Sequence, residues 1–264
     1  MTLQIRKAYA DLPAGQLHYR VSGRGGVPLV CLAPAPFSGL AFANILPLLG
    51  KSRAAFAPDY PGYGGSDEIA ECSSIADYAA AMLAFCKAIL PGQKIDVLGF
   101  HSGCLVAAEM ALQAGPSVRE IVLIDVPAFE PEQRKRMARR FVGERYDTEE
   151  LGALESLWDR AVVSRRATQP IGQRLALFAE MVARGEGLDR MFEAAFSYSV
   201  EERFAALTLP VSVIATNGSL KEPTHRAASL LPAANLSDCD DISGSVLDAH
   251  AAQTAAVVDA VLNS

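Results

Sequence analysis

The chain has 264 residues, of which half are hydrophobic and a fifth are charged, as in ordinary globular proteins. Its formal net charge of −6 argues against a nucleic-acid or anionic-membrane surface, because such surfaces need clustered excess Lys and Arg. The N-terminal stretch has no apolar signal-peptide region, and no apolar run approaches the roughly 18 residues of a membrane span. We therefore expect a cytoplasmic protein without a nucleic-acid or membrane partner.

The five cysteines are odd in number, widely scattered and without C-x-x-C pairs. This pattern favours reduced, mostly buried thiols over a disulfide framework or a zinc site. The sequence also lacks a phosphate-binding loop, a G-x-G-x-x-G dinucleotide motif and a cluster of His and Asp at metal-ligand spacing. We expect neither a cofactor nor a metal.

Short apolar runs alternate with helical patterns in the first half of the chain. Strands are expected at residues 3–9, 16–21, 29–33, 53–57, 95–98 and 120–125, and helices at 41–49, 75–90 and from Cys104 onward. Because alternating strands and helices build parallel sheets, this order predicts an α/β fold: a mostly parallel, twisted sheet with helices on both faces.

The alternation stops after Pro127. Helical periodicity dominates residues 129–205, and strand-like runs return only at 211–215 and, weakly, at 235–237. Further helices are expected at 224–231 and 247–262. This organisation predicts a core made of residues 1–128 and 206–264, with an inserted helical cap of residues 129–205.

Residues 94–110, KIDVLGFHSGCLVAAEM, contain the most informative local pattern. An apolar run leads into Gly99-Phe100-His101-Ser102-Gly103, and an alanine-rich helical pattern follows. Glycines two residues on either side of a turn apex let backbone pack against backbone, so the spacing predicts a nucleophile elbow with His101 at its apex. Ser102 is the alternative apex, but that register places Phe100 where the turn requires a small residue.

Two stretches, APDYPGYGGSD at residues 57–67 and VLGFHSGCLVAAEMAL at 97–112, resemble motifs of the α/β-hydrolase superfamily. The histidine apex resembles a bacterial subgroup whose elbow reads G-x-H-[ST]-G. The resemblance implies the α/β-hydrolase fold with an inserted helical cap and a small organic substrate. It also implies a degenerate triad, since the usual acid position falls near Ser219 and the usual histidine position near Gly244.

Several residues are candidates for the chemistry. His101 at a helix N-terminus is expected to be neutral near pH 7, as a base or nucleophile requires, or else it only lines a pocket. Asp125, the last residue of the strand expected at 120–125, could orient a histidine or bond to nearby backbone. The remaining candidates are His250, which could reach the pocket or lie at the surface, Pro34, Ala35 and the Ser102 N–H as oxyanion-binding groups, and Trp158 as a pocket wall.

These residues leave functions of different classes open. One is a hydrolase that cleaves an ester, a lactone or a C–C bond with His101 at the elbow. Another is a catalytically inactive protein that keeps only a small-molecule pocket. A cofactor-free lyase or oxygenase on the same fold is a third, and a scaffold whose cap mediates self-association is a fourth.

Overall fold

The structure, a computed structural model, describes residues 3–69, 72–142 and 150–263. Its centre is an eight-stranded sheet with the order β1-β2-β4-β3-β5-β6-β7-β8, in which only the β1–β2 and β2–β4 pairs are antiparallel. The strands are β1 (Arg6–Leu12), β2 (Gly15–Ser22), β3 (Leu29–Leu32), β4 (Ala55–Pro58), β5 (Ile95–Phe100), β6 (Val118–Ile124), β7 (Val211–Thr216) and β8 (Ala234–Cys239). The predicted mostly parallel α/β sheet is confirmed.

The central strands are buried on both faces, which is why they read as continuous apolar runs. All residues of β3 and β5 are buried, including one carboxylate, Asp96. Arg119 on the neighbouring strand β6 donates to both oxygens of Asp96, at 2.7 and 2.6 Å. A bidentate guanidinium offsets the cost of burying that charge.

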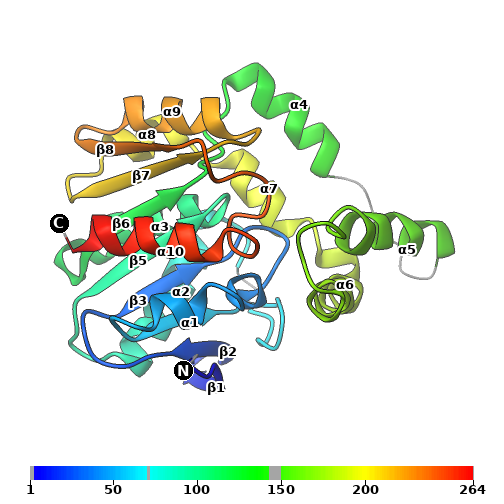
Figure 1. The fold of residues 1–264 in the computed structure, drawn as a ribbon, viewed down its shortest axis with the longest axis horizontal. Helices are drawn as coiled ribbons and strands as arrows, with labels where there is room; N and C mark the ends of the chain where they lie inside the picture. Colours follow the sequence, from blue (N-terminus) through cyan, green and yellow to red (C-terminus); the bar gives the residue numbers. More distant parts are fainter. Residues whose placement is uncertain (1–2, 70–71, 143–149, 264) are drawn as a thin grey trace.

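Helices cover both faces of the sheet, as predicted. In Figure 1, α10 (Ala251–Leu262) crosses in front of the sheet beside α1 (Leu46–Leu49), and α3 (Gly103–Ala114) lies behind it. Helix α2 (Ile75–Ile89) packs against α3, and α9 (Lys221–Leu230) packs against β7 and β8. None of the helices described has both the length and the apolar composition that crossing a bilayer requires.

Three predicted helices had wrong bounds, and the one expected at 224–231 begins three residues earlier, at Lys221. Residues 41–49 do not form one helix but a 3₁₀ turn, Gly39–Phe42, followed by α1, because Pro47 opens a new helix instead of continuing one. The last helix begins at Ala251 and not at residue 247, since Asp248 is held in a turn by the Ser245 hydroxyl at 3.1 Å.

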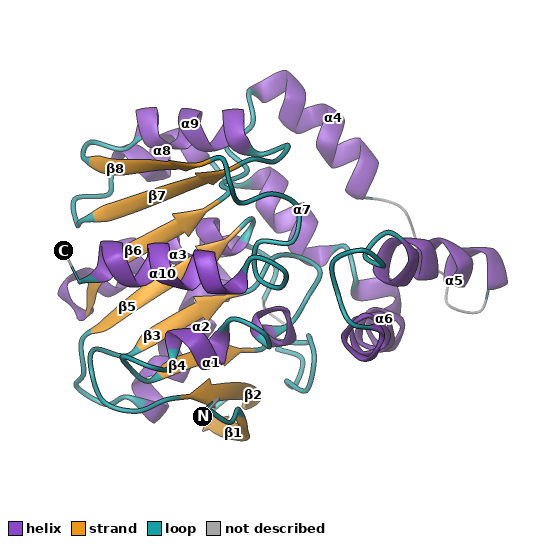
Figure 2. Cartoon of the chain, in the orientation of Figure 1, coloured by secondary structure: helices purple, strands orange, loops and turns teal. Residues whose placement is uncertain are grey.

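Between β6 and β7 the described residues form helices and no strand. These are α4 (Pro131–Phe141), α5 (Leu151–Trp158), a π-helical turn (Asp159–Val163), α6 (Ile171–Arg184), a 3₁₀ turn (Gly185–Gly187), α7 (Arg190–Ser197) and α8 (Val200–Ala205). Figure 2 shows α4, α5 and α6 beyond the edge of the sheet to which the arrowheads of the parallel strands point. We call residues 131–205 the helical segment.

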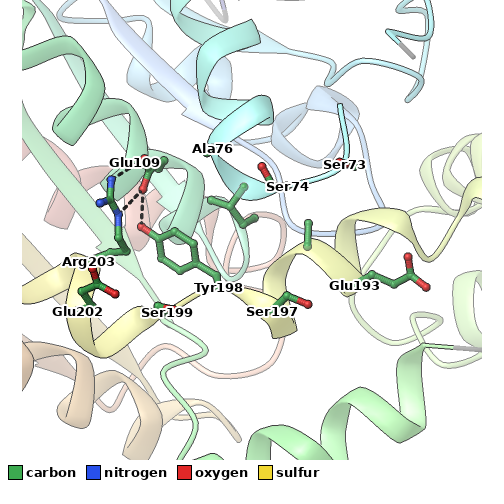
Figure 3. A pocket seen from close by; sticks show the side chains of 12 residues that line it. Ser73, Ser74, Ala76, Glu109, Glu193, Ser197, Tyr198, Ser199, Glu202 and Arg203 are labelled. Carbon is green, nitrogen blue, oxygen red and sulfur yellow. Dashed lines mark hydrogen bonds and ion pairs between the residues drawn. The ribbon is translucent and has the colours of Figure 1, made fainter. Parts of the chain in front are cut away.

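A buried carboxylate on α3, a helix that packs on the sheet, binds two residues of the helical segment. Glu109 is only 3% exposed and accepts hydrogen bonds from the Tyr198 hydroxyl at 3.1 Å and from Arg203 at 2.7 and 2.9 Å (Figure 3). Burial disfavours the ionised carboxylate, but the bonds from Arg203, Gln113 and Tyr198 outweigh it, so the pKa of Glu109 is lowered. The ionised form therefore stabilises the junction between α3 and α8.

We expect Glu109→Ala to lower the free energy of unfolding by about 1–3 kcal/mol, because Tyr198 and the half-exposed Arg203 lose their acceptor. Urea denaturation measures the loss, and Glu202→Ala, which removes an exposed carboxylate next to Arg203 on α8, is the control. The difference between the wild type and Glu109→Gln should shrink as the pH falls through the lowered pKa, because protonation then removes the charge in the folded state. Equal losses in Glu109→Ala and Glu202→Ala would contradict this assignment.

Candidate functional site

The turn between β5 and α3 holds His101 in a left-handed backbone conformation, with φ at 50°. Ser102, the next residue, already has helical angles (φ −61°, ψ −23°). A Cβ at Gly103 would lie 2.2 Å from the Leu32 carbonyl oxygen, and one at Gly99 would lie 2.5 Å from the Cys104 Cα. Both glycines are therefore required by close backbone packing, and the strained residue between them is His101.

The His101 side chain lines two neighbouring cavities, of about 540 and 230 Å³. Its ring lies against that of Phe100, with the centroids 4.0 Å apart. Within the described part of the chain, neither ring nitrogen has a hydrogen-bond partner. Burial, with a smaller contribution from the positive charge of Arg165, lowers the pKa of His101 to about 4. The imidazole is therefore neutral at physiological pH, as expected from the sequence, although burial is the larger cause.

The smaller cavity is mostly apolar on the side of the helical segment, where Arg134 is the one charged residue among the described residues that line it. Four phenylalanine rings stack there with centroid separations of 5.1–6.4 Å, namely Phe129, Phe141, Phe192 and Phe196. On the sheet side, Ala35, His101 and Ser102 line the same cavity. An aromatic body would therefore fit between these rings and the His101 imidazole.

The larger cavity is more polar. Arg165, Gln169 and Asp248 line it together with Pro34, Ala35 and His101. Phe141 and Phe192 line both cavities, so the two are parts of one site around His101.

Ser102 interacts with the other predicted oxyanion-binding segment. The Ala35 N–H donates to the Ser102 Oγ at 2.7 Å, so this backbone donor is already satisfied. The structure thus brings Pro34, Ala35, His101 and Ser102 together, as the sequence predicted for these four, but it leaves the Ala35 N–H unavailable to a substrate oxygen.

Three other predicted site residues lie outside both cavities. Asp125, at φ 54°, accepts from the Thr216 N–H at 2.9 Å and from the Thr216 hydroxyl at 2.7 Å, so it joins β6 to β7. His250 is only partly exposed at the start of α10, where its Nδ1 lies 3.0 Å from the Gln253 Oε1. Trp158 is 41% exposed and packs edge-on against Phe178. Each has a local partner that keeps it away from His101.

The sequence analysis missed the polar wall of the larger cavity. Asp248 accepts four hydrogen bonds, from Gln169, Gln173, Asn44 and Ser245, at 2.5, 2.7, 2.9 and 3.1 Å. Arg165 projects over the Phe37 ring at 4.7 Å. No local pattern could have separated Arg165 from its exposed neighbour Arg166, because the contacts that define its place come from distant parts of the chain. The described residues contain no group of three or more His, Cys, Asp or Glu arranged to hold a metal ion.

Comparison with known proteins gives a family and a fold. The family model described as alpha/beta hydrolase fold matches residues 23–156. No curated protein matches the chain. Among solved structures, a bromoperoxidase from Bacillus anthracis covers 98% of this chain and 100% of its own at 14% identity, with a TM-score of 0.79.

Two esterases are similar to the same extent. The one from Exiguobacterium antarcticum is 13% identical over 98% of this chain and 100% of its own, with a TM-score of 0.77. The thermophilic esterase from Thermogutta terrifontis is 18% identical over 98% of both chains, with a TM-score of 0.74. At these identities the likeness concerns the fold alone.

The lowered pKa of His101 can be measured directly. In an NMR titration of the four histidines, we expect one ring to stay neutral until about pH 4, and we expect its resonance to be missing from His101→Asn. A midpoint for that ring near its ordinary value of 6.5 would show that the imidazole is solvated.

Proposed function

The chain belongs to the α/β-hydrolase fold family, and on that premise we propose that it hydrolyses a small organic ester or lactone with His101 as the catalytic base. The observation that carries the proposal is a neutral imidazole without a protein partner, held at φ 50° where β5 meets α3 and open to two cavities. Cleavage of a C–C bond, which the sequence analysis expected beside ester and lactone cleavage, would also use His101 as the base.

The proposed reaction needs one proton acceptor. A water molecule attacks the carbonyl carbon while the His101 imidazole takes one of its protons, giving a tetrahedral intermediate and an imidazolium. The C–O bond to the leaving group then breaks, and the imidazolium returns the proton to the departing oxygen. Direct attack by the imidazole, with an acyl-imidazole that water later hydrolyses, is the alternative use of the same residue.

The negatively charged oxygen of the tetrahedral intermediate needs a hydrogen-bond donor. The Ser102 N–H, at the first position before α3, has no acceptor in the described part of the chain, and the helix dipole favours an anion there. The Ala35 N–H is occupied by the Ser102 Oγ. We therefore assign a single oxyanion donor, fewer than the pair that such sites commonly use.

We also assign residues 129–205 as a cap on a core of residues 1–128 and 206–264. This division is supported by the composition of the cavity walls, which come from both parts: Pro34 and His101 from the core, and Arg165 and Phe192 from the helical segment. In this assignment the cap supplies the groups that select the substrate.

A panel of p-nitrophenyl esters tests the base. We expect His101→Ala to lower kcat/KM by roughly 10²–10⁴-fold, the usual contribution of a general base. Ser102→Ala should stay within about threefold of the wild type, because the Ser102 oxygen serves the Ala35 N–H and its removal frees that donor. Hydrolysis that survives His101→Ala but not Ser102→Ala, with fluorophosphonate labelling of Ser102, would identify a serine nucleophile instead.

The pH dependence is a separate test. Because only the neutral imidazole can accept a proton, kcat/KM should be constant above about pH 5 and fall as the pH drops through about 4. The profile is measured with an ester that is stable in acid. A midpoint between pH 6 and 7 that disappears in His101→Asn would contradict the buried environment assigned to the ring.

A ligand-binding protein without turnover is the second candidate. It is favoured by two observations: among the residues described, Asp125 bonds to Thr216 and not to His101, and the Ala35 N–H is occupied by Ser102. On the described part of the chain, His101 then has no orienting acid, and the site has no second oxyanion donor. Absence of turnover on the whole ester panel, together with calorimetric binding of a small molecule that His101→Ala weakens, would select this function.

A further inference from the structure

Arg165 is a cation in the wall of the His101 cavity that lacks an anionic partner. Its Nε is buried without a hydrogen-bond partner, and its guanidinium forms no hydrogen bond or ion pair with any residue described. Its one close partner is the Phe37 ring, 4.7 Å away. Burial lowers the pKa of Arg165, and the charge of Asp248 opposes this only in part.

Asp248 is not the missing hydrogen-bonding anion of Arg165. Asp248 attracts Arg165 electrostatically, but its two oxygens already accept hydrogen bonds from four neutral groups, two on each oxygen. An ionised carboxylate has about four acceptor positions, so Asp248 is saturated. The negative charge of Asp248 acts on Arg165, but the carboxylate has no acceptor position left for a hydrogen bond from the guanidinium.

A second unsatisfied polar atom lies in the same cavity. Gln169 is only 9% exposed, and its Nε2 donates to Asp248, which fixes the orientation of the amide. Its Oε1 is buried and has no donor. A buried polar group without a hydrogen-bond partner lowers the stability of the folded protein. Two such groups in the wall of one cavity therefore indicate that a ligand supplies their partners.

From these two groups we propose that the larger cavity is a carboxylate subsite: the substrate is an organic acid whose carboxylate binds the Arg165 guanidinium and which donates a hydrogen bond to Gln169. Its apolar or aromatic body lies against the phenylalanine rings, and its ester or lactone carbonyl lies at His101. The inference rests on the proposed function for the reaction, but the subsite itself concerns binding alone.

Calorimetric titration with 4-phenylbutanoate and with 5-phenylpentan-2-one, its neutral methyl ketone analogue, tests the Arg165 half of the subsite in the intact protein. Neither probe can donate to Gln169, so charge-assisted hydrogen bonds to Arg165 should make the acid bind at least about tenfold more tightly than the ketone. Arg165→Met should abolish the preference, whereas Arg166→Met, which removes an exposed charge next to it, should retain it. Equal affinities in the wild type, no binding of the acid, or an undiminished preference in Arg165→Met would each overturn the proposal.

A kinetic comparison separates failure of the subsite from failure of the proposed function. Mono-p-nitrophenyl glutarate carries a carboxylate that p-nitrophenyl pentanoate lacks, and Arg165→Met should raise KM for the glutarate alone. Hydrolysis of both esters with equal KM in the wild type would keep the hydrolase and reject the subsite. Binding of 4-phenylbutanoate with the predicted preference but without hydrolysis of either ester would keep the subsite and reject the hydrolase.

Discussion

The close approach of two backbones at the end of β5 determines the geometry of the site. Gly103 lies against the Leu32 carbonyl so tightly that no side chain fits, and Gly99 lies equally tightly against Cys104. The chain can reverse within this space only if the residue between them adopts positive φ, a strain that the surrounding strands hold in place. As a result, the His101 side chain lies at the carboxyl end of β5, in a cavity that Arg165 and Phe192 of the helical segment also line.

Local hydrogen bonds decide which polar groups near this turn are available. Asp125 is strained like His101, yet both of its oxygens are taken by Thr216, and its pKa is raised by burial. The Ala35 N–H is taken by Ser102. His101 has no such partner among the residues described, so the strained side chain that remains available to a ligand is a neutral imidazole.

The sequence predicted what depends on short-range pattern and missed what depends on tertiary placement. Runs such as Leu29–Leu32 are apolar throughout because both faces of β3 are covered, and the spacing of Gly99 and Gly103 is local, so the sheet and the turn could be predicted. Arg165 and Gln169 meet Asp248 only after the chain folds. Trp158 has an aromatic side chain at helical spacing, a pattern that does not distinguish a pocket wall from a half-exposed contact with Phe178.

In the proposed reaction, the bonds between Asp125 and Thr216 change what the ligand has to supply. In a Ser-His-Asp site, a buried aspartate stabilises the imidazolium that forms during the reaction. Here Asp125 is bound to Thr216, and the charge of Arg165 acts against protonation of His101. A carboxylate bound to Arg165 would neutralise that opposing charge and place a negative charge in the same cavity, so it would favour the imidazolium. In the proposed reaction, binding and proton transfer would be coupled. Arg165 would bind the anionic substrate, and until the substrate is bound its positive charge would disfavour protonation of His101.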